Sequence, residues 1–119
     1  MPLTTLLLCN DLVGTGNYYH ETLGFTVADS LESTITVRLD DCSLTFTEQN
    51  IWGSPVTFSG TLYFAISNVD RYYESVKDKT AIAWPLQDMP YGSREFGLRD
   101  CNGYYLAFTQ ISVDSKSVD

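Results

Sequence analysis

The chain has 119 residues, of which 44% are hydrophobic and 18% are charged, so it is long enough for one domain with a real core and too apolar to be disordered. Its formal net charge is −8, with only seven Lys and Arg residues, which argues against nucleic acid as a partner because phosphate binding requires a basic surface. The apolar stretch near the N-terminus is short and lacks a basic flank, so we expect neither a signal peptide nor a membrane span. Three cysteines at unrelated spacings, Cys9, Cys42 and Cys101, favour reduced thiols and a cytoplasmic location.

The first half of the chain, about residues 3–50, predicts a strand, a helix and three further strands. A capping residue, Thr15 or Asn17, starts the helix, and Gly24 ends it in the left-handed conformation. The strands are predicted from apolar and polar alternation, most clearly on either side of the Asp40-Asp41 turn. The predicted elements are a strand at 4–9, a loop at 10–16, a helix through 18–23, a strand at 25–28, a turn at 29–33, and strands at 34–39 and 42–47.

A connector that contains glycine and proline, about residues 51–60, precedes a second half with the same order. Its predicted elements are a strand at 62–66, a helix at 69–78 capped by Asn68, a strand at 81–84, a loop at 85–89 and a final hairpin. Each half places a tyrosine pair on its helix, Tyr18-Tyr19 and Tyr72-Tyr73, so we interpret the chain as two copies of a βαβββ unit in one domain. The second module then spans about residues 61–111, and the polar tail 112–119 is expected to fray.

The final hairpin, residues 91–109, carries the strongest local signal. Its turn is Asp100-Cys101-Asn102-Gly103, in which the carboxylate accepts from backbone amides and the Asn-Gly pair tolerates the positive φ of a G1 bulge. In this register Glu95 lies opposite Thr109, Gly97 opposite Ala107 and Arg99 opposite Tyr105. One face is apolar and suited to pack on a helix; it consists of Phe96, Leu98, Tyr104, Leu106 and Phe108. The other face places polar groups around two small residues, which indicates a concave surface.

Two segments resemble the vicinal oxygen chelate superfamily, the group of glyoxalases, bleomycin-resistance proteins and extradiol dioxygenases. Tyr91-Gly92-Ser93-Arg94-Glu95-Phe96 followed by Asp100-Cys101-Asn102-Gly103-Tyr104 looks like the final hairpin of that family, where an Asp-Pro-Asp-Gly turn is usual. Asp11-Leu12, Tyr18-Tyr19 and Leu23-Gly24-Phe25 are similar to its first loop and helix. The resemblance covers roughly residues 3–111 and implies an α+β fold of two βαβββ modules, whose curved mixed sheets surround a shared cleft.

In the metalloenzymes of this family, one His, Gln or Glu from each of four strands binds a divalent ion in the cleft, as the resemblance implies. The matching positions here are Thr4, Thr45, Leu62 and Ala107, with Ser43 in place of Thr45 if the register slips, and none of these is a good metal ligand. A shift by one residue offers Thr5, Leu44, Tyr63 and Leu106, which are no better. The sole histidine, His20, falls on the first helix, outside the cleft, where a solvated side chain is the ordinary interpretation. We therefore expect no metal, no cofactor and no assigned catalytic residue, and leave open whether the protein is an enzyme.

The residues expected to bind a ligand in the cleft are Thr45, Trp52, Leu62, Phe64, Glu95, Tyr105 and Ala107. Phe64 shares a face with Leu62 and is predicted to point into the cleft, whereas Tyr63 and Ala65 would face the helix. Trp52 would form an aromatic lid or, equally, part of a dimer interface. Glu95 either holds a cationic ligand, or acts as a base, or forms a salt bridge with Arg94 or Arg99.

Three functions follow from this interpretation. The first is a metal-free homodimer that sequesters a cationic or aromatic small molecule, as in the antibiotic-resistance members of the family. The second is an enzyme, either a lyase or isomerase that uses Glu95 or a dioxygenase-type enzyme with a metal site built from unexpected residues. The third is a role in binding a partner or in assembly, with an incidental cleft.

Overall fold

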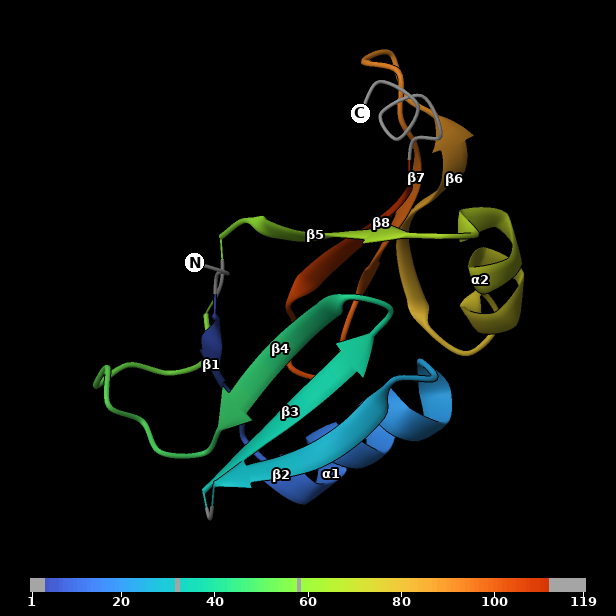
Figure 1. The fold of residues 1–119 in the computed structure, drawn as a ribbon. Helices are drawn as coiled ribbons and strands as arrows, with labels where there is room; N and C mark the ends of the chain where they lie inside the picture. Colours follow the sequence, from blue (N-terminus) through green and yellow to red (C-terminus); the bar gives the residue numbers. More distant parts are fainter. Residues whose placement is uncertain (1–3, 32, 58, 112–119) are drawn as a thin grey trace.

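Two four-stranded mixed sheets, each with a helix beside it, make up residues 4–31, 33–57 and 59–111, the part of the chain that the computed structural model describes (Figure 1). The first sheet has the strand order β1-β4-β3-β2 and the second the order β5-β8-β7-β6. In each sheet the first pair is parallel and the other pairs are antiparallel. The predicted α+β class and the repeated βαβββ order are therefore confirmed. The elements are β1 (Leu6–Leu8), α1 (Leu12–Asn17), the π-helical turn η1 (Tyr18–Thr22), β2 (Thr26–Leu31), β3 (Thr34–Leu39), β4 (Cys42–Thr47), β5 (Thr61–Ile66), α2 (Val69–Val76), β6 (Ala81–Asp88), β7 (Arg94–Arg99) and β8 (Tyr105–Gln110).

The first helix begins earlier than predicted, inside the segment expected to be a loop. Asp11 is its N-cap, and the carboxylate accepts a hydrogen bond from the Gly14 amide at 3.1 Å. Two glycines lower the intrinsic helix propensity of this segment, but Gly16 lets the helix approach the sheet. A Cβ at Gly16 would already lie 3.3 Å from Cδ1 of Ile35. The helix ends as expected, with Gly24 at φ +78°.

Strand β6 corrects a second prediction, because it runs on through Pro85 into the segment expected to be a loop. Proline has no amide hydrogen for the ladder, and the pairing with β7 shifts on both sides of Trp84. This irregularity is tolerated because β6 is the outermost strand of its sheet. Strand β2 likewise extends to Leu31, past its expected end at residue 28.

The helix-covered faces of the two sheets share one hydrophobic core. The last hairpin has the predicted register, and its apolar face is buried. Phe64 stacks on Phe108 with 5.0 Å between ring centroids, and Phe25 of the first module contacts Phe64 at 5.8 Å. Tyr72 on α2 packs on Phe108 from the same side at 4.8 Å. Among the described residues, no helix lies on the opposite face of either sheet, which we call the uncovered face (Figure 1).

Polar bonds join the two modules at the edge of this core. The Tyr19 hydroxyl donates to Oδ2 of Asp100 at 2.5 Å, across 81 positions of sequence. The Tyr72 hydroxyl donates to the Leu23 carbonyl at 2.6 Å.

The helices in the described ranges are all too short or too polar to cross a bilayer. The tail expected to fray lies outside the described residues.

Candidate functional site

The uncovered face of the second sheet brings four residues into one row. Tyr63 pairs with Ala107, Ala107 with Gly97, and Gly97 with Trp84. Residues that pair across neighbouring strands point to the same side of a sheet. The Trp84 indole lies directly over Gly97, where a Cβ would overlap its ring atoms. Gly97 and Ala107 therefore form a floor of small residues, and Trp84 partly fills the surface that the sequence predicted to be concave.

Glu95 is the acidic residue of this face, and only 1% of its surface is exposed. Its Oε2 accepts a hydrogen bond from Nε1 of Trp84 at 3.2 Å, and its Oε1 accepts from the Ser93 hydroxyl at 3.0 Å. Both of these donors are uncharged, so neither of them supplies a counter-ion for a carboxylate. A buried charge without a counter-ion is costly and is uncommon in proteins.

Neither arginine on the same strand forms a salt bridge with Glu95, which was one of the alternatives for this carboxylate. Arg94 pairs with Asp70 at 2.8 Å and with Asp88 at 3.1 Å. The Arg99 guanidinium instead lies 5.6 Å from the centroid of the Tyr105 ring. In the part of the chain that the structure describes, Glu95 makes no ion pair. This outcome favours the cation-holding interpretation of Glu95 over the salt bridge.

Two exposed tyrosines lie near Glu95: Tyr91, which interacts with the carboxylate, and Tyr63, which interacts with Tyr91. Tyr91 is 64% exposed and Tyr63 is 60% exposed. Desolvation of the Tyr91 hydroxyl and its interactions with Glu95 and Tyr63 raise the pKa of Tyr91 to about 12. The faces of tyrosine and tryptophan rings attract cations electrostatically. We call Glu95 with Tyr63, Trp84 and Tyr91 the Glu95 cluster.

Three of the predicted ligand-binding residues lie on this uncovered face: Glu95, Ala107 and Tyr105. Leu62 and Phe64 do not lie on it, which corrects the prediction that they point into the cleft that Glu95 faces, although both line the groove described next. Phe64 is 2% exposed in the core, and Leu62 pairs with the core residue Leu106. Leu62, Phe64 and Ile66 are the more apolar of the two alternating sets on β5, so they are the set that the core buries. Tyr63, which was expected to face the helix, faces outward instead.

Thr45 lies on the uncovered face of the first sheet, between Leu6 and Thr36. Its Oγ1 is 3.1 Å from Oγ1 of Thr36. A groove of about 730 Å³ runs nearby, where β1 and β4 meet β5, and Tyr63 lines it on the side of the second sheet. The remaining lining residues are Thr4, Thr5, Arg38, Asp41, Cys42, Ser43, Leu44, Thr61, Leu62 and Phe64. Tyr63 thus connects this groove with the Glu95 cluster.

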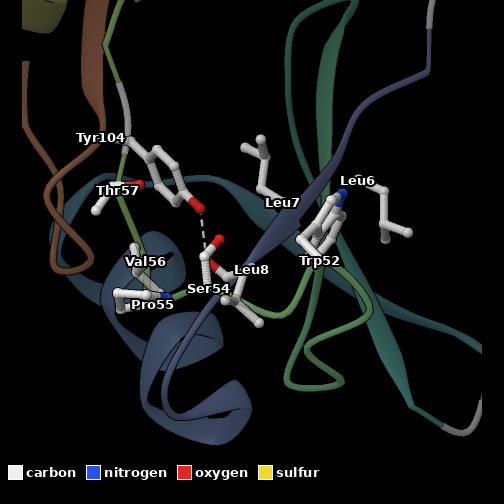
Figure 2. A pocket seen from close by; sticks show the side chains of 9 residues that line it. All are labelled: Leu6, Leu7, Leu8, Trp52, Ser54, Pro55, Val56, Thr57 and Tyr104. Atoms are coloured by element: carbon white, nitrogen blue, oxygen red, sulfur yellow. Dashed lines mark hydrogen bonds between the residues drawn. The ribbon is translucent and has the colours of Figure 1, made fainter.

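Trp52 occupies a separate pocket of about 270 Å³ between the connector and β1 (Figure 2). The Asn50 side chain shapes the connector there, because its oxygen accepts from the amides of Trp52 at 3.2 Å and Gly53 at 2.9 Å. Figure 2 shows the Trp52 ring beside Leu6 on one side of the pocket. On the other side, the Tyr104 hydroxyl donates a hydrogen bond to the Leu8 carbonyl at 2.6 Å. None of the Glu95 cluster lines this pocket.

The four strand positions that correspond to metal ligands do not fit a divalent ion. The side chains of Leu62 and Ala107 have no donor atom. Within the described ranges no three His, Cys, Asp or Glu side chains lie close enough to share a metal. Divalent ions such as Mg²⁺, Ni²⁺ or Zn²⁺ require carboxylate, imidazole or thiolate ligands. We therefore derive no metal-dependent step for this chain.

Comparison with solved structures gives full-length matches at low sequence identity, which show a shared fold. TioX from Micromonospora sp. ML1 is 21% identical, with a TM-score of 0.73, and the match covers 95% of this chain and 98% of that one. A bleomycin resistance determinant encoded on the transposon Tn5 is 18% identical, with a TM-score of 0.76 and coverage of 95% and 99%. A protein of unknown function from Agrobacterium tumefaciens str. C58 is 17% identical, with a TM-score of 0.77 and coverage of 94% and 95%. No curated protein matches the chain.

A family model gives the more specific result. The model described as "Glyoxalase/Bleomycin resistance protein/Dioxygenase superfamily" matches residues 3–108, which include both modules and the connector. The match agrees with the repeated βαβββ order and with the final hairpin. The chain belongs to the glyoxalase, bleomycin resistance protein and dioxygenase superfamily.

Proposed function

We propose that this protein binds a small organic cation at the Glu95 cluster without the help of a metal. The observation that carries the proposal is a carboxylate that is 1% exposed, has uncharged donors on both oxygens, and interacts with Tyr91, which is 64% exposed and in turn interacts with the exposed Tyr63. A cation on the ring faces would gain cation–π attraction and would neutralise the buried charge. The net charge of −8 adds long-range attraction for such a ligand.

The proposed action is stoichiometric capture. Trp84 and Ser93 hold both oxygens of Glu95, so the carboxylate is arranged to supply charge, and no observation favours its use as a base in the enzyme alternative. A ligand does not need to reach the carboxylate, because the exposed rings of Tyr63 and Tyr91 provide the contact surface. One solved neighbour is a bleomycin resistance determinant, which supports sequestration of an antibiotic-like cation as the finer form of this proposal.

We also propose that the protein is a cytoplasmic homodimer in which a second copy covers the uncovered sheet faces. The exposed large apolar residues include Leu6, Tyr63 and Tyr91, which lie on or beside these faces, and Trp52 in the neighbouring pocket. Thr45 and Trp52 then remain candidates for ligand contact across the dimer. The three cysteines are free thiols, as expected in a reducing compartment. The shared core supports treatment of the two modules as one domain.

Binding of benzyltrimethylammonium tests the proposal. We expect Glu95→Gln to weaken binding about tenfold, or ~1.4 kcal/mol, because the variant keeps the size of the side chain and loses its charge. Glu21→Gln is the matched control, since it removes one negative charge from an exposed position on η1. Melting temperatures measured over a series of ligand concentrations give the three affinities. Equal affinities for both variants would show that only net charge matters, and would overturn the assignment of the site.

A further inference from the structure

A second groove, of about 530 Å³, lies on the first module between α1 and the strands β2 and β3. No residue of the second sheet lines it. Its lining residues are Leu12, Val13, Gly16, Asn17, His20, Thr26, Val27 and Ile35. Two apolar side chains in it are accessible to solvent: Val13 is 74% exposed and Val27 is 37% exposed. The size is in the usual range for small-molecule sites, about 300–1,000 Å³.

Gly16 shapes the floor of this groove. A Cβ built on Gly16 would lie 3.3 Å from Cδ1 of Ile35 and 3.6 Å from Cγ1 of Val27. A larger residue would therefore either fill the floor or push the helix away from the sheet. Glycine keeps the helix close to the sheet and leaves Val27, which is 37% exposed, accessible in the groove beside the buried Ile35.

His20 supplies the groove with a hydrogen-bond acceptor of fixed position. Its Nδ1 lies 3.0 Å from the Phe25 carbonyl oxygen. A carbonyl only accepts, so the proton of the neutral imidazole must be on Nδ1, and Nε2 carries the lone pair. His20 belongs to the π-helical turn η1, and backbone bonds from the Gly24 amide to His20 and from the Phe25 amide to Tyr19 hold that turn in place. The ring is therefore oriented, although His20 is exposed.

We infer that this groove binds a phenol or an aromatic alcohol. The aromatic ring of the ligand packs on Val13 and Val27, and its hydroxyl donates to Nε2 of His20. Because Nε2 accepts and does not donate in this tautomer, the site selects a ligand that carries a donor and disfavours a carboxylate. The groove shares no residue with the Glu95 cluster, so this inference does not depend on the proposed function.

Titration of the full chain with p-cresol at pH 8 tests the inference, and toluene is the matched ligand without a hydroxyl. Because His20 is the only histidine, ¹⁵N NMR reports its two ring nitrogens without overlap. We expect p-cresol to shift the Nε2 resonance more than the Nδ1 resonance and to bind about tenfold more tightly than toluene. An unmoved Nε2 resonance at saturating p-cresol would overturn the inference.

Three variants locate the binding. His20→Phe keeps an aromatic ring and removes the acceptor, so it should abolish the preference for p-cresol over toluene. Val13→Asp leaves the bond between His20 and Phe25 intact and should weaken both ligands, which keeps the test valid if His20→Phe does not fold. Glu95→Gln should leave p-cresol binding unchanged. Unchanged p-cresol affinity in His20→Phe or Val13→Asp, or a loss in Glu95→Gln, would place the ligand elsewhere.

Discussion

Replacement of Asp100 by alanine removes an acceptor that joins the last hairpin to the first module. The side chain of Asp100 accepts three hydrogen bonds: Oδ1 from the amides of Asn102 at 2.9 Å and Tyr104 at 2.8 Å, and Oδ2 from the Tyr19 hydroxyl. Tyr19 is fully buried, so loss of its acceptor costs about 1–3 kcal/mol. The two turn bonds contribute about 0.5–1.5 kcal/mol each. We therefore expect Asp100→Ala to lower the free energy of unfolding by about 2–6 kcal/mol, a large share of the usual 5–15 kcal/mol for a domain.

Urea unfolding at pH 7, followed by circular dichroism, measures this change. Tyr19→Phe removes only the bond between the modules and should cost about 1–3 kcal/mol. In the double variant the two losses should not add, because Tyr19 and Asp100 act on each other. If Asp100→Ala lowered the free energy of unfolding by less than about 1 kcal/mol, the energies assigned to its three bonds would be refuted. Strictly additive losses in the double variant would refute the bond between Tyr19 and Asp100.

The pH dependence of the same site has a defined sign. Burial raises the pKa of Asp100 above its usual value. A raised pKa in the folded state means that protonation of Asp100 adds stability that is fully present below the unfolded value, about pH 3.9, and is lost as the pH rises through the folded pKa; the hydrogen bonds that its oxygens accept remain at pH 7. Asp100→Asn does not titrate there. The stability advantage of the natural protein over Asp100→Asn should therefore shrink from about pH 3 towards pH 7, and an advantage that grows with pH would contradict the burial argument.

Three further predictions concern packing, metals and assembly. Gly97→Ala should lower the free energy of unfolding by about 1–3 kcal/mol, because the added methyl group overlaps the Trp84 indole. Adding Trp84→Ala to this variant should recover part of the loss. An unchanged urea midpoint in Gly97→Ala would contradict the overlap. Elemental analysis should find no stoichiometric divalent ion, and added Zn²⁺ or Ni²⁺ should not raise the melting temperature; one ion per chain would overturn the metal-free proposal. Sedimentation at micromolar concentration should give twice the 13.4 kDa chain mass, and a strict monomer would contradict the dimer.

The parts of the fold that were predicted correctly depend on local chemistry. The Asp100-to-Gly103 turn sets the hairpin register through bonds within the turn, with Gly103 at φ +91°. Asn68 caps α2 by accepting from the Arg71 amide at 3.1 Å. Such signals lie within a few residues of each other, so the sequence contains them in full.

The errors arise where packing outweighs local signals. Helix α1 starts before Gly14, and strand β6 runs through Pro85. Both depend on contacts with a sheet, and intrinsic propensities do not take such contacts into account. The face of β5 was misassigned because Leu62 was placed by resemblance at a metal position, although the apolar alternation of residues 62, 64 and 66 already favoured the core. The Glu95 cluster was only partly predictable. Tyr91 precedes β7, and its interactions with Glu95 and Tyr63, which raise its pKa, depend on the three-dimensional fold.

Calorimetric titration with choline and with its neutral isostere 3,3-dimethylbutan-1-ol tests the central claim most directly. The two ligands have nearly the same shape and differ in charge, so the ratio of their affinities measures how far the site recognises a cation. Binding at the Glu95 cluster predicts that choline binds at least about tenfold more tightly. It also predicts that Glu95→Gln reduces this preference. Equal binding of the two ligands, or an unchanged preference in Glu95→Gln, would contradict cation capture at this site.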